Sequence, residues 1–262
     1  MAIVTLTTDL GNTDYYAAAL HGTLLRYLRD VTIVDITHQI EPYNILQAAF
    51  VLRQAFAHFP EGTIHLALAD TYGGSRKQPL IASYRSHWFV APDNGLLALL
   101  WEADEADAVW RTDPDLLPQV QPSLMAQPCV AAVVALALGK PPNSIGSPCT
   151  DFVRLSFGLP VLSRDFLRGE VIHVDHFGNC IVNISRHDFE RIGNGRPFQI
   201  KFKRYDELNQ LSQDYGSVDH GRMLCFFNAA GYLEIAINHA HAAKLLNLRV
   251  RDKVEVTFRS QA

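Results

Sequence analysis

Strand-length and helix-length apolar patterns alternate along the first hundred residues. The strand-like runs cover residues 2–6, 31–36 and 63–69. Helical spacing fills the gaps between them, over residues 13–28 and 45–56. This order predicts parallel strands joined by crossover helices. Such sheets bind ligands beyond the carboxyl ends of their strands. Aspartates stand at or near three of these ends: Asp9, Asp35 and Asp70.

The remaining segments complete the first domain and predict a second domain of a different kind. Residues 80–84 and 87–90 favour a hairpin, 96–101 a short helix, 114–128 an irregular connection and 129–138 a buried helix. From residue 168 onward only short strands separated by turns are predicted, a pattern typical of a small antiparallel barrel or sandwich. We therefore predict an α/β domain with a mostly parallel sheet (1–157), a linker (158–167) and a smaller all-β, barrel-like domain (168–262).

Composition excludes several classes of protein. Hydrophobic residues make up 48% of the 262-residue chain, which is too high a share for a disordered protein. A net charge of −4 without a basic cluster argues against nucleic-acid binding. The longest apolar run, residues 129–138, is about half of what a membrane-spanning helix needs. The N-terminus lacks the features of a secretory signal.

Cysteines and histidines give no sign of a metal site. The four cysteines are scattered and include no CxxC pair, so we expect reduced thiols in a cytoplasmic protein. The 11 histidines include no HExxH motif, and the close pairs His173/His176 and His239/His241 lack a third ligand nearby in sequence. We expect no metal and no cofactor.

Four short segments carry candidate chemistry, each with a structural alternative. Residues 7–12 (TTDLGN) place a carboxylate at a strand end, where it can accept bonds from a ribose diol or merely cap a helix. Residues 70–77 (DTYGGSRK) can orient a water or a polar ligand, or form an ordinary surface loop. Residues 175–179 (DHFGN) can stack on and pair with a planar ring, or simply turn the chain. Residues 228–231 (NAAG) are most simply a hairpin turn.

Taken in order, these segments resemble the adenosyl-forming S-adenosylmethionine hydrolases, which are related to S-adenosylmethionine-dependent chlorinases and fluorinases. Further matching segments are 34–40 (VDITHQI), 59–63 (FPEGT), 91–97 (APDNGLL), 183–184 (NI) and 228–238 (NAAGYLEIAIN). The resemblance extends from about residue 3 to residue 257. It implies a homotrimer in which the ligand lies between the N-terminal domain of one subunit and the C-terminal domain of its neighbour.

The resemblance also implies roles for individual residues. Asp9 matches the carboxylate that holds the ribose hydroxyls, and Tyr43 falls at a position near the ribose. Asp175 matches the carboxylate near the methionine amino group, while Phe177 and Asn179 match adenine contacts. Contact positions where the backbone matters fall on Ala229, Ala230 and His239.

The implied reaction is displacement at the ribose C5′ carbon, with methionine leaving. In the hydrolases, an Asp, an Arg and a His hold the attacking water. Here Asp70 matches the Asp, and Lys77, preceded by Arg76, falls where the Arg is expected. The His position is Leu124, and for an enzyme a histidine from elsewhere in the trimer, such as His38 or His21, would replace it.

Two interpretations follow. The first is an S-adenosylmethionine hydrolase that uses Asp70 with Arg76 or Lys77. The second is a protein of the same fold that binds adenosine or S-adenosylmethionine with little or no turnover. A halogenase is disfavoured, because an ionised Asp70 would repel a halide at short range.

Overall fold

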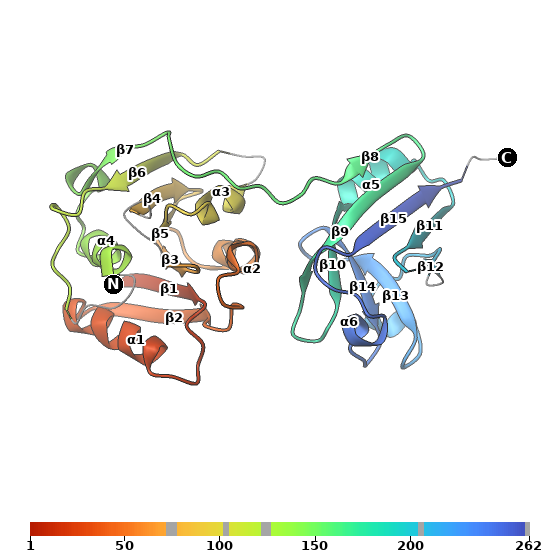
Figure 1. The fold of residues 1–262 in the computed structure, drawn as a ribbon, viewed down its shortest axis with the longest axis horizontal. Helices are drawn as coiled ribbons and strands as arrows, with labels where there is room; N and C mark the ends of the chain where they lie inside the picture. The colour runs from red at the N-terminus through yellow and green to blue at the C-terminus, as the bar shows by residue number, and fades with distance from the viewer. Residues whose placement is uncertain (72–77, 102–104, 122–126, 204–206, 260–262) are drawn as a thin grey trace. The chain divides into compact units, whose positions relative to one another are not determined.

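A computed structural model describes residues 1–71, 78–101, 105–121, 127–203 and 207–259. The chain forms two compact units, Met1–Ser156 and Phe157–Ala262 (Figure 1). The first is built on a mostly parallel sheet and the second on an antiparallel one. The predicted fold class is confirmed.

The sheet of the first unit has the strand order β2-β1-β3-β5-β4-β6-β7. Its strands are β1 (Ala2–Thr8), β2 (Val31–Thr37), β3 (Ile64–Leu68), β4 (Pro79–Tyr84), β5 (His87–Pro92), β6 (Ala108–Thr112) and β7 (Gly146–Pro148). The pairs β1–β2, β1–β3 and β3–β5 are parallel, as the strand–helix alternation predicts. The pair β4–β5 forms the predicted hairpin, and β6 and β7 extend the antiparallel edge.

Helices cover both faces of this sheet. On one face, α1 (Tyr16–Tyr27) and α4 (Gln127–Ala137) pack on apolar side chains of β1 and β3. On the other lie α2 (Ile45–Ala55), whose first turn is capped by the Asn44 side chain, and α3 (Leu96–Trp101) (Figure 1). Residues 129–135 of α4 are all buried, which agrees with its continuous apolar sequence. Two single-turn helices, η1 (Phe56–His58) and η2 (Pro142–Ser144), complete this unit.

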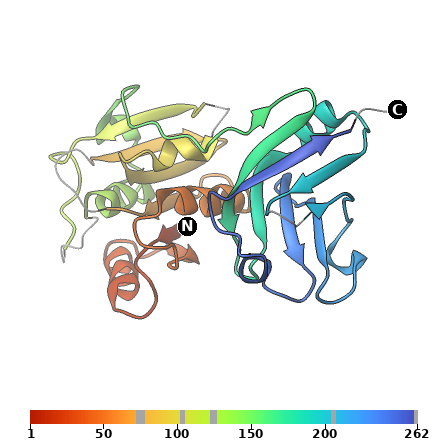
Figure 2. The same ribbon diagram turned by 45° about the vertical axis from the view of Figure 1, so that its right-hand side comes forward.

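The second unit is a curved antiparallel sheet with the order β12-β11-β15-β9-β10-β14-β13 (Figure 2). Its strands are β8 (Val161–Leu162), β9 (Phe166–Val174), β10 (Cys180–Ser185), β11 (Phe198–Lys201), β12 (Glu207–Leu208), β13 (Met223–Phe227), β14 (Tyr232–Ile237) and β15 (Lys253–Phe258). After β12 the chain returns to β13, where the Ser212 N–H donates to the Cys225 carbonyl at 2.7 Å and nearly closes the barrel. Strand β8 lies within the predicted linker and pairs with β9.

Short helices decorate the barrel where the sequence analysis expected only strands and turns. They are α5 (Arg186–Gly193), α6 (Ala242–Leu245) and the single turn η3 (Tyr215–Ser217). The Ser185 side chain caps α5, and His241 caps α6. The barrel core is apolar and includes Leu167, Val182, Ile235 and Val256.

The structure leaves all four cysteines as free thiols. Within the described residues, no helix has both the length and the apolar character that crossing a membrane requires.

Candidate functional site

The first part of the site is the carboxylate of Asp9, directly after β1. The Asp9 N–H donates to the Leu68 carbonyl at 3.0 Å and so extends the pairing of β1 with β3. Its side-chain Oδ2 accepts two bonds of 3.0 Å, from the backbone N–H groups of Tyr43 and Asp70. One carboxylate therefore joins the ends of two strands and the segment before α2.

Both donors to Asp9 have left-handed backbone conformations. The φ angles are 67° at Tyr43 and 50° at Asp70. Such conformations cost non-glycine residues about 1–3 kcal/mol and persist only where the surroundings hold them. The bonds to Asp9 hold them here, and the Asn94 side chain adds support by donating to the Ala69 carbonyl at 2.8 Å. The backbone at the ends of β1 and β3 is thus strained and held in place by hydrogen bonds, as is common at ligand-binding sites. We call Asp9, Tyr43 and Asp70 the rim of the sheet.

Only one member of the predicted catalytic set can be placed. Asp70 lies half-buried on this rim. Arg76, Lys77 and Leu124 fall outside the described residues. The two histidines considered as substitutes, His21 and His38, both direct a ring nitrogen at Asp35. Asp35, the remaining strand-end aspartate, therefore contacts these two histidines. Unlike Asp9, it takes no part in the bonds to Tyr43 and Asp70.

The second part of the site is the turn between β9 and β10. Asp175 accepts two bonds from Asn179, from its backbone N–H at 2.8 Å and from its side-chain Nδ2 at 2.9 Å. Because a carboxylate only accepts, these bonds fix which end of the Asn179 amide is the nitrogen. The Asp175 carboxylate therefore fixes the position of the Asn179 side chain within the turn.

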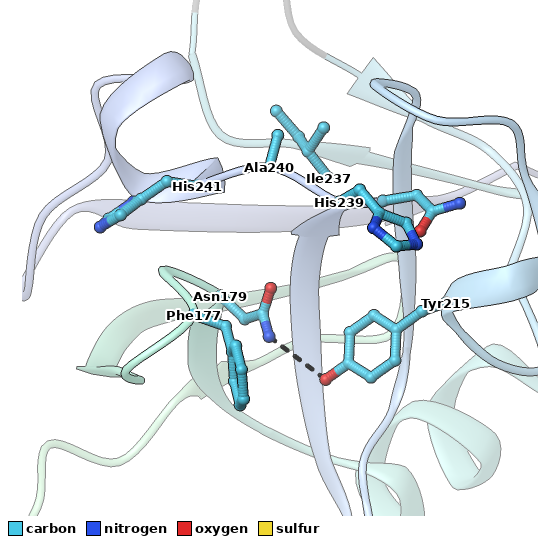
Figure 3. A pocket seen from close by; sticks show the side chains of 8 residues that line it. Phe177, Asn179, Tyr215, Ile237, His239, Ala240 and His241 are labelled. Carbon is cyan, nitrogen blue, oxygen red and sulfur yellow. Dashed lines mark hydrogen bonds between the residues drawn. The ribbon is translucent and has the colours of Figure 1, made fainter.

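Asn179 lines a pocket of about 590 Å³ in the second unit (Figure 3). The lining residues are Phe177, Asn179, Tyr215, Ile237, Asn238, His239, Ala240 and His241. Phe177 is 74% exposed, so its ring is accessible at the pocket surface. The amide oxygen of Asn179 points toward the side of the pocket that carries Ile237 and Ala240 (Figure 3). A planar, partly apolar ligand with a donor on its edge fits these features.

A hydrogen-bonded network of polar side chains extends from the pocket lining. Asn179 Nδ2 also donates to the Tyr215 hydroxyl at 3.2 Å, and this hydroxyl donates to Glu234 Oε1 at 2.5 Å. Asn228 holds the other oxygen of the buried Glu234 at 3.1 Å. Burial, followed by the bond to Glu234, raises the pKa of Tyr215, so the phenol stays protonated and keeps donating.

Gly178 allows the turn to pack closely against the segment that precedes α6. Its φ of +87° is in the left-handed region, and an added Cβ would lie 2.1 Å from His241 Nδ1. The Gly178 carbonyl accepts a bond from the Ala243 N–H at 2.8 Å. A glycine is therefore needed at this position for both conformation and space.

The predicted ligand residues of the second unit are only partly gathered at this pocket. Phe177, Asn179 and His239 line it. Ala229 and Ala230 are exposed in the turn before β14, whereas the pocket residues Asn238, His239, Ala240 and His241 follow its far end. Sequence reasoning missed Tyr215, which lies in no recognisable motif, and Asn238, which ends the matched segment 228–238.

The sequence matches a known protein family over most of its length. Residues 4–146 match the N-terminal domain and residues 169–255 the C-terminal domain of the SAM hydroxide adenosyltransferase family. The chain belongs to this family. The matched segments contain Asp9, Asp70, the Asp175–Asn179 turn and the pocket, so every candidate position lies within family sequence.

Relatives extend over nearly the whole chain. Proteins named (R)-S-adenosyl-L-methionine hydrolase from Salinispora tropica and Methanocaldococcus jannaschii are 31% and 29% identical, over 97% and 98% of this chain and 97% and 96% of their own. A protein named fluorinase from Actinopolyspora mzabensis is 29% identical over 97% of each chain. A crystal structure of an uncharacterized conserved protein from Thermotoga maritima has a TM-score of 0.86 at 29% identity, covering 97% of this chain and 99% of that one. The resemblance predicted from the sequence motifs is therefore confirmed.

Proposed function

We propose that this SAM hydroxide adenosyltransferase family member hydrolyses (R)-S-adenosyl-L-methionine to adenosine and methionine. The observation that carries the proposal is the pair of bonds that Asp9 Oδ2 accepts from Tyr43 and Asp70. This arrangement places two carboxylates at adjacent strand ends. Asp9 is suited to bind a ribose diol, and Asp70 lies beside it. Full-length relatives named as hydrolases supply the reaction class.

The reaction requires little from the protein besides alignment. A water oxygen forms a bond to the ribose C5′ carbon as the C5′–sulfur bond breaks, and the electron pair of that bond neutralises the sulfonium. The attacking water loses a proton, which Asp70 accepts as general base. Because methionine is a neutral leaving group, no general acid is needed. Before this step, Arg76 or Lys77 would balance the negative charge of the Asp70 carboxylate.

Substrate recognition is divided between the two units. Asp9 would accept bonds from the ribose hydroxyls, with Tyr43 beside the sugar. In the pocket of the second unit, the exposed Phe177 ring offers a stacking surface, and the Asn179 amide oxygen can accept a bond from the adenine amino group.

Further contacts follow the family pattern. Asp175 would lie near the methionine ammonium group, although both of its oxygens also hold Asn179. Ala229, Ala230 and His239 would contribute through their backbones. No cofactor enters this scheme.

The two sets of contacts lie in different units, and the family resemblance implies that they meet across subunits. We therefore propose that the active form is a homotrimer, with each site completed by a neighbouring subunit, and that it works in the cytoplasm. Light scattering on the purified protein tests the assembly. A mass of about three times the 29.3 kDa chain supports it. A stable monomer that binds adenosine at full affinity contradicts it.

The alternative is a protein that binds adenosine or S-adenosylmethionine without appreciable turnover. It is favoured by Leu124 at the position where the family has its histidine. Chromatography of the products after incubation with S-adenosylmethionine separates the two functions. Equal amounts of adenosine and methionine support hydrolysis, whereas binding without products supports the alternative.

A further inference from the structure

Three side chains that the sequence analysis did not join as a site converge beside β2. His21 lies on α1, Asp35 on β2, and His38 directly after β2. His21 Nε2 lies 2.7 Å and His38 Nε2 3.1 Å from the same oxygen, Asp35 Oδ1. Two imidazoles and a carboxylate thus offer three ligand atoms, all within 4.8 Å of one another.

One of these atoms is buried without a hydrogen bond. His38 is 4% exposed, and its Nε2 has no hydrogen-bond partner among the described residues despite its proximity to Asp35. Its other ring nitrogen, Nδ1, is hydrogen-bonded to Thr8 Oγ1 at 2.7 Å. Burying a polar atom without a partner costs free energy. A ligand from outside the chain that binds His38 Nε2 would offset this cost.

We propose that His21, Asp35 and His38 bind a divalent transition-metal ion of the zinc type. Imidazole nitrogens with one carboxylate suit zinc, whereas magnesium and calcium prefer oxygen ligands alone. Three protein ligands leave a fourth position for water. The inference does not rest on the proposed hydrolase activity.

Two of the three ligand–ligand distances require only a small adjustment, and the third, between His21 and His38, is within 4.8 Å. Ligand atoms about 2.0–2.1 Å from a tetrahedral ion lie about 3.3 Å from each other. The His38–Asp35 separation is already close to this value, and the His21–Asp35 separation must open by about 0.6 Å. His21 and Asp35 can move, because their side chains are 30% and 42% exposed.

The surroundings of His38 fit a ligand role. Metal-bound histidines almost always hydrogen-bond through their second nitrogen, which fixes the ring, and Thr8 does this for His38. The His38 carbonyl also accepts a bond from the Gly11 N–H at 2.7 Å. A bound ion would therefore link α1 and β2, and through His38 it would also link Thr8 and Gly11, which lie on either side of Asp9. We expect such an ion to stabilise the fold.

Zinc binding to chelator-treated protein tests the proposal. The wild type should bind one zinc ion per chain with a rise in melting temperature, and cobalt should give the visible absorption of a tetrahedral site. His21→Gln and Asp35→Asn should each weaken zinc binding by about tenfold or more. His58→Gln, an exposed histidine of the same unit, is the matched control and should bind like the wild type.

Two results would overturn the proposal. One is a wild type that binds no zinc and whose melting temperature zinc leaves unchanged. The other is equal zinc affinity in the wild type and both ligand variants, which would place the ion on other histidines. Melting curves without zinc check that the variants are folded, and the partial exposure of His21 and Asp35 makes these substitutions tolerable.

Discussion

The carboxylate of Asp9 accepts a hydrogen bond from the backbone N–H of Asp70, at 3.0 Å. Parallel pairing of β1 with β3, in which Thr8 lies opposite Leu68, sets the two aspartates at neighbouring strand ends. The bond helps to hold Asp70 in its left-handed conformation. The residue proposed to bind ribose therefore also positions the residue proposed to activate water.

Replacing Asp9 with alanine should greatly weaken nucleoside binding. The substitution removes a charged acceptor and frees the N–H groups of Tyr43 and Asp70. A loss of about 2–4 kcal/mol, or roughly 30-fold or more in affinity, is expected. Calorimetric titration with adenosine measures it, with Asp30→Ala, an exposed aspartate of the same unit, as control. An affinity within about threefold of the wild type would remove Asp9 from the site.

Replacing Asp70 with asparagine should separate binding from turnover. Asparagine tolerates the left-handed backbone as aspartate does, so the rim should keep its shape. Turnover should fall by at least about 100-fold, because the general base is lost. Adenosine affinity should remain close to that of the wild type. Product assays and titrations on one preparation check both, with the exposed Asp115→Asn as control; unchanged turnover rejects Asp70 as the base.

Replacing Gly178 with alanine should damage the pocket of the second unit. The new methyl group would collide with the His241 ring, and the φ of +87° adds backbone strain. Gly195→Ala is a matched control, since its φ is +72° and a Cβ there meets nothing within 4 Å. We expect about 1–2 kcal/mol of destabilisation from strain in the control and more in Gly178→Ala. Equal melting temperatures and adenosine affinities for the two variants would contradict the close-packing account.

Stability should decline in mild acid because of His65. Burial and then the neighbouring His87 lower the pKa of His65 from 6.5 to about 3. The folded protein therefore holds this ring neutral, whereas the unfolded chain binds a proton below pH 6.5. The stabilisation is complete above that pH and is lost as the pH falls toward 3. Between pH 7.5 and pH 5, the loss from this group is at most about 2 kcal/mol.

Urea unfolding at these two pH values tests the role of His65. His65→Gln should lose less stability than the wild type between pH 7.5 and pH 5, while the exposed His58→Gln should keep the wild-type slope. An unchanged slope in His65→Gln would assign the acid sensitivity to other groups.

Sequence patterns predicted the regular elements of both units because local signals and packing agree there. The short strands predicted from residue 168 onward are present, among them Met223–Phe227, Tyr232–Ile237 and Lys253–Phe258. The helix α5 was missed, because most of its eight residues are polar or charged and only the Ser185 cap marks its start. The strands β6 and β7 were missed, because β6 has only five residues and the edge strand β7 has three, none of them a large apolar residue.

The site could be predicted only where neighbouring residues carry it. The Asp175–Asn179 turn is local, and its motif was visible in the sequence. Tyr215 contacts Asn179, which is 36 residues away in sequence, and His21 on α1 contacts Asp35 on β2. Such convergence depends on strand order and helix placement, which a single sequence does not specify.

The most direct test of the hydrolase account is the fate of oxygen from water. The protein is incubated with S-adenosylmethionine in oxygen-18 water, with and without chloride, and the products are identified by mass spectrometry. The account predicts methionine and adenosine labelled at the 5′ oxygen under both conditions. A 5′-chlorinated nucleoside, or bound ligand with no product, would contradict it.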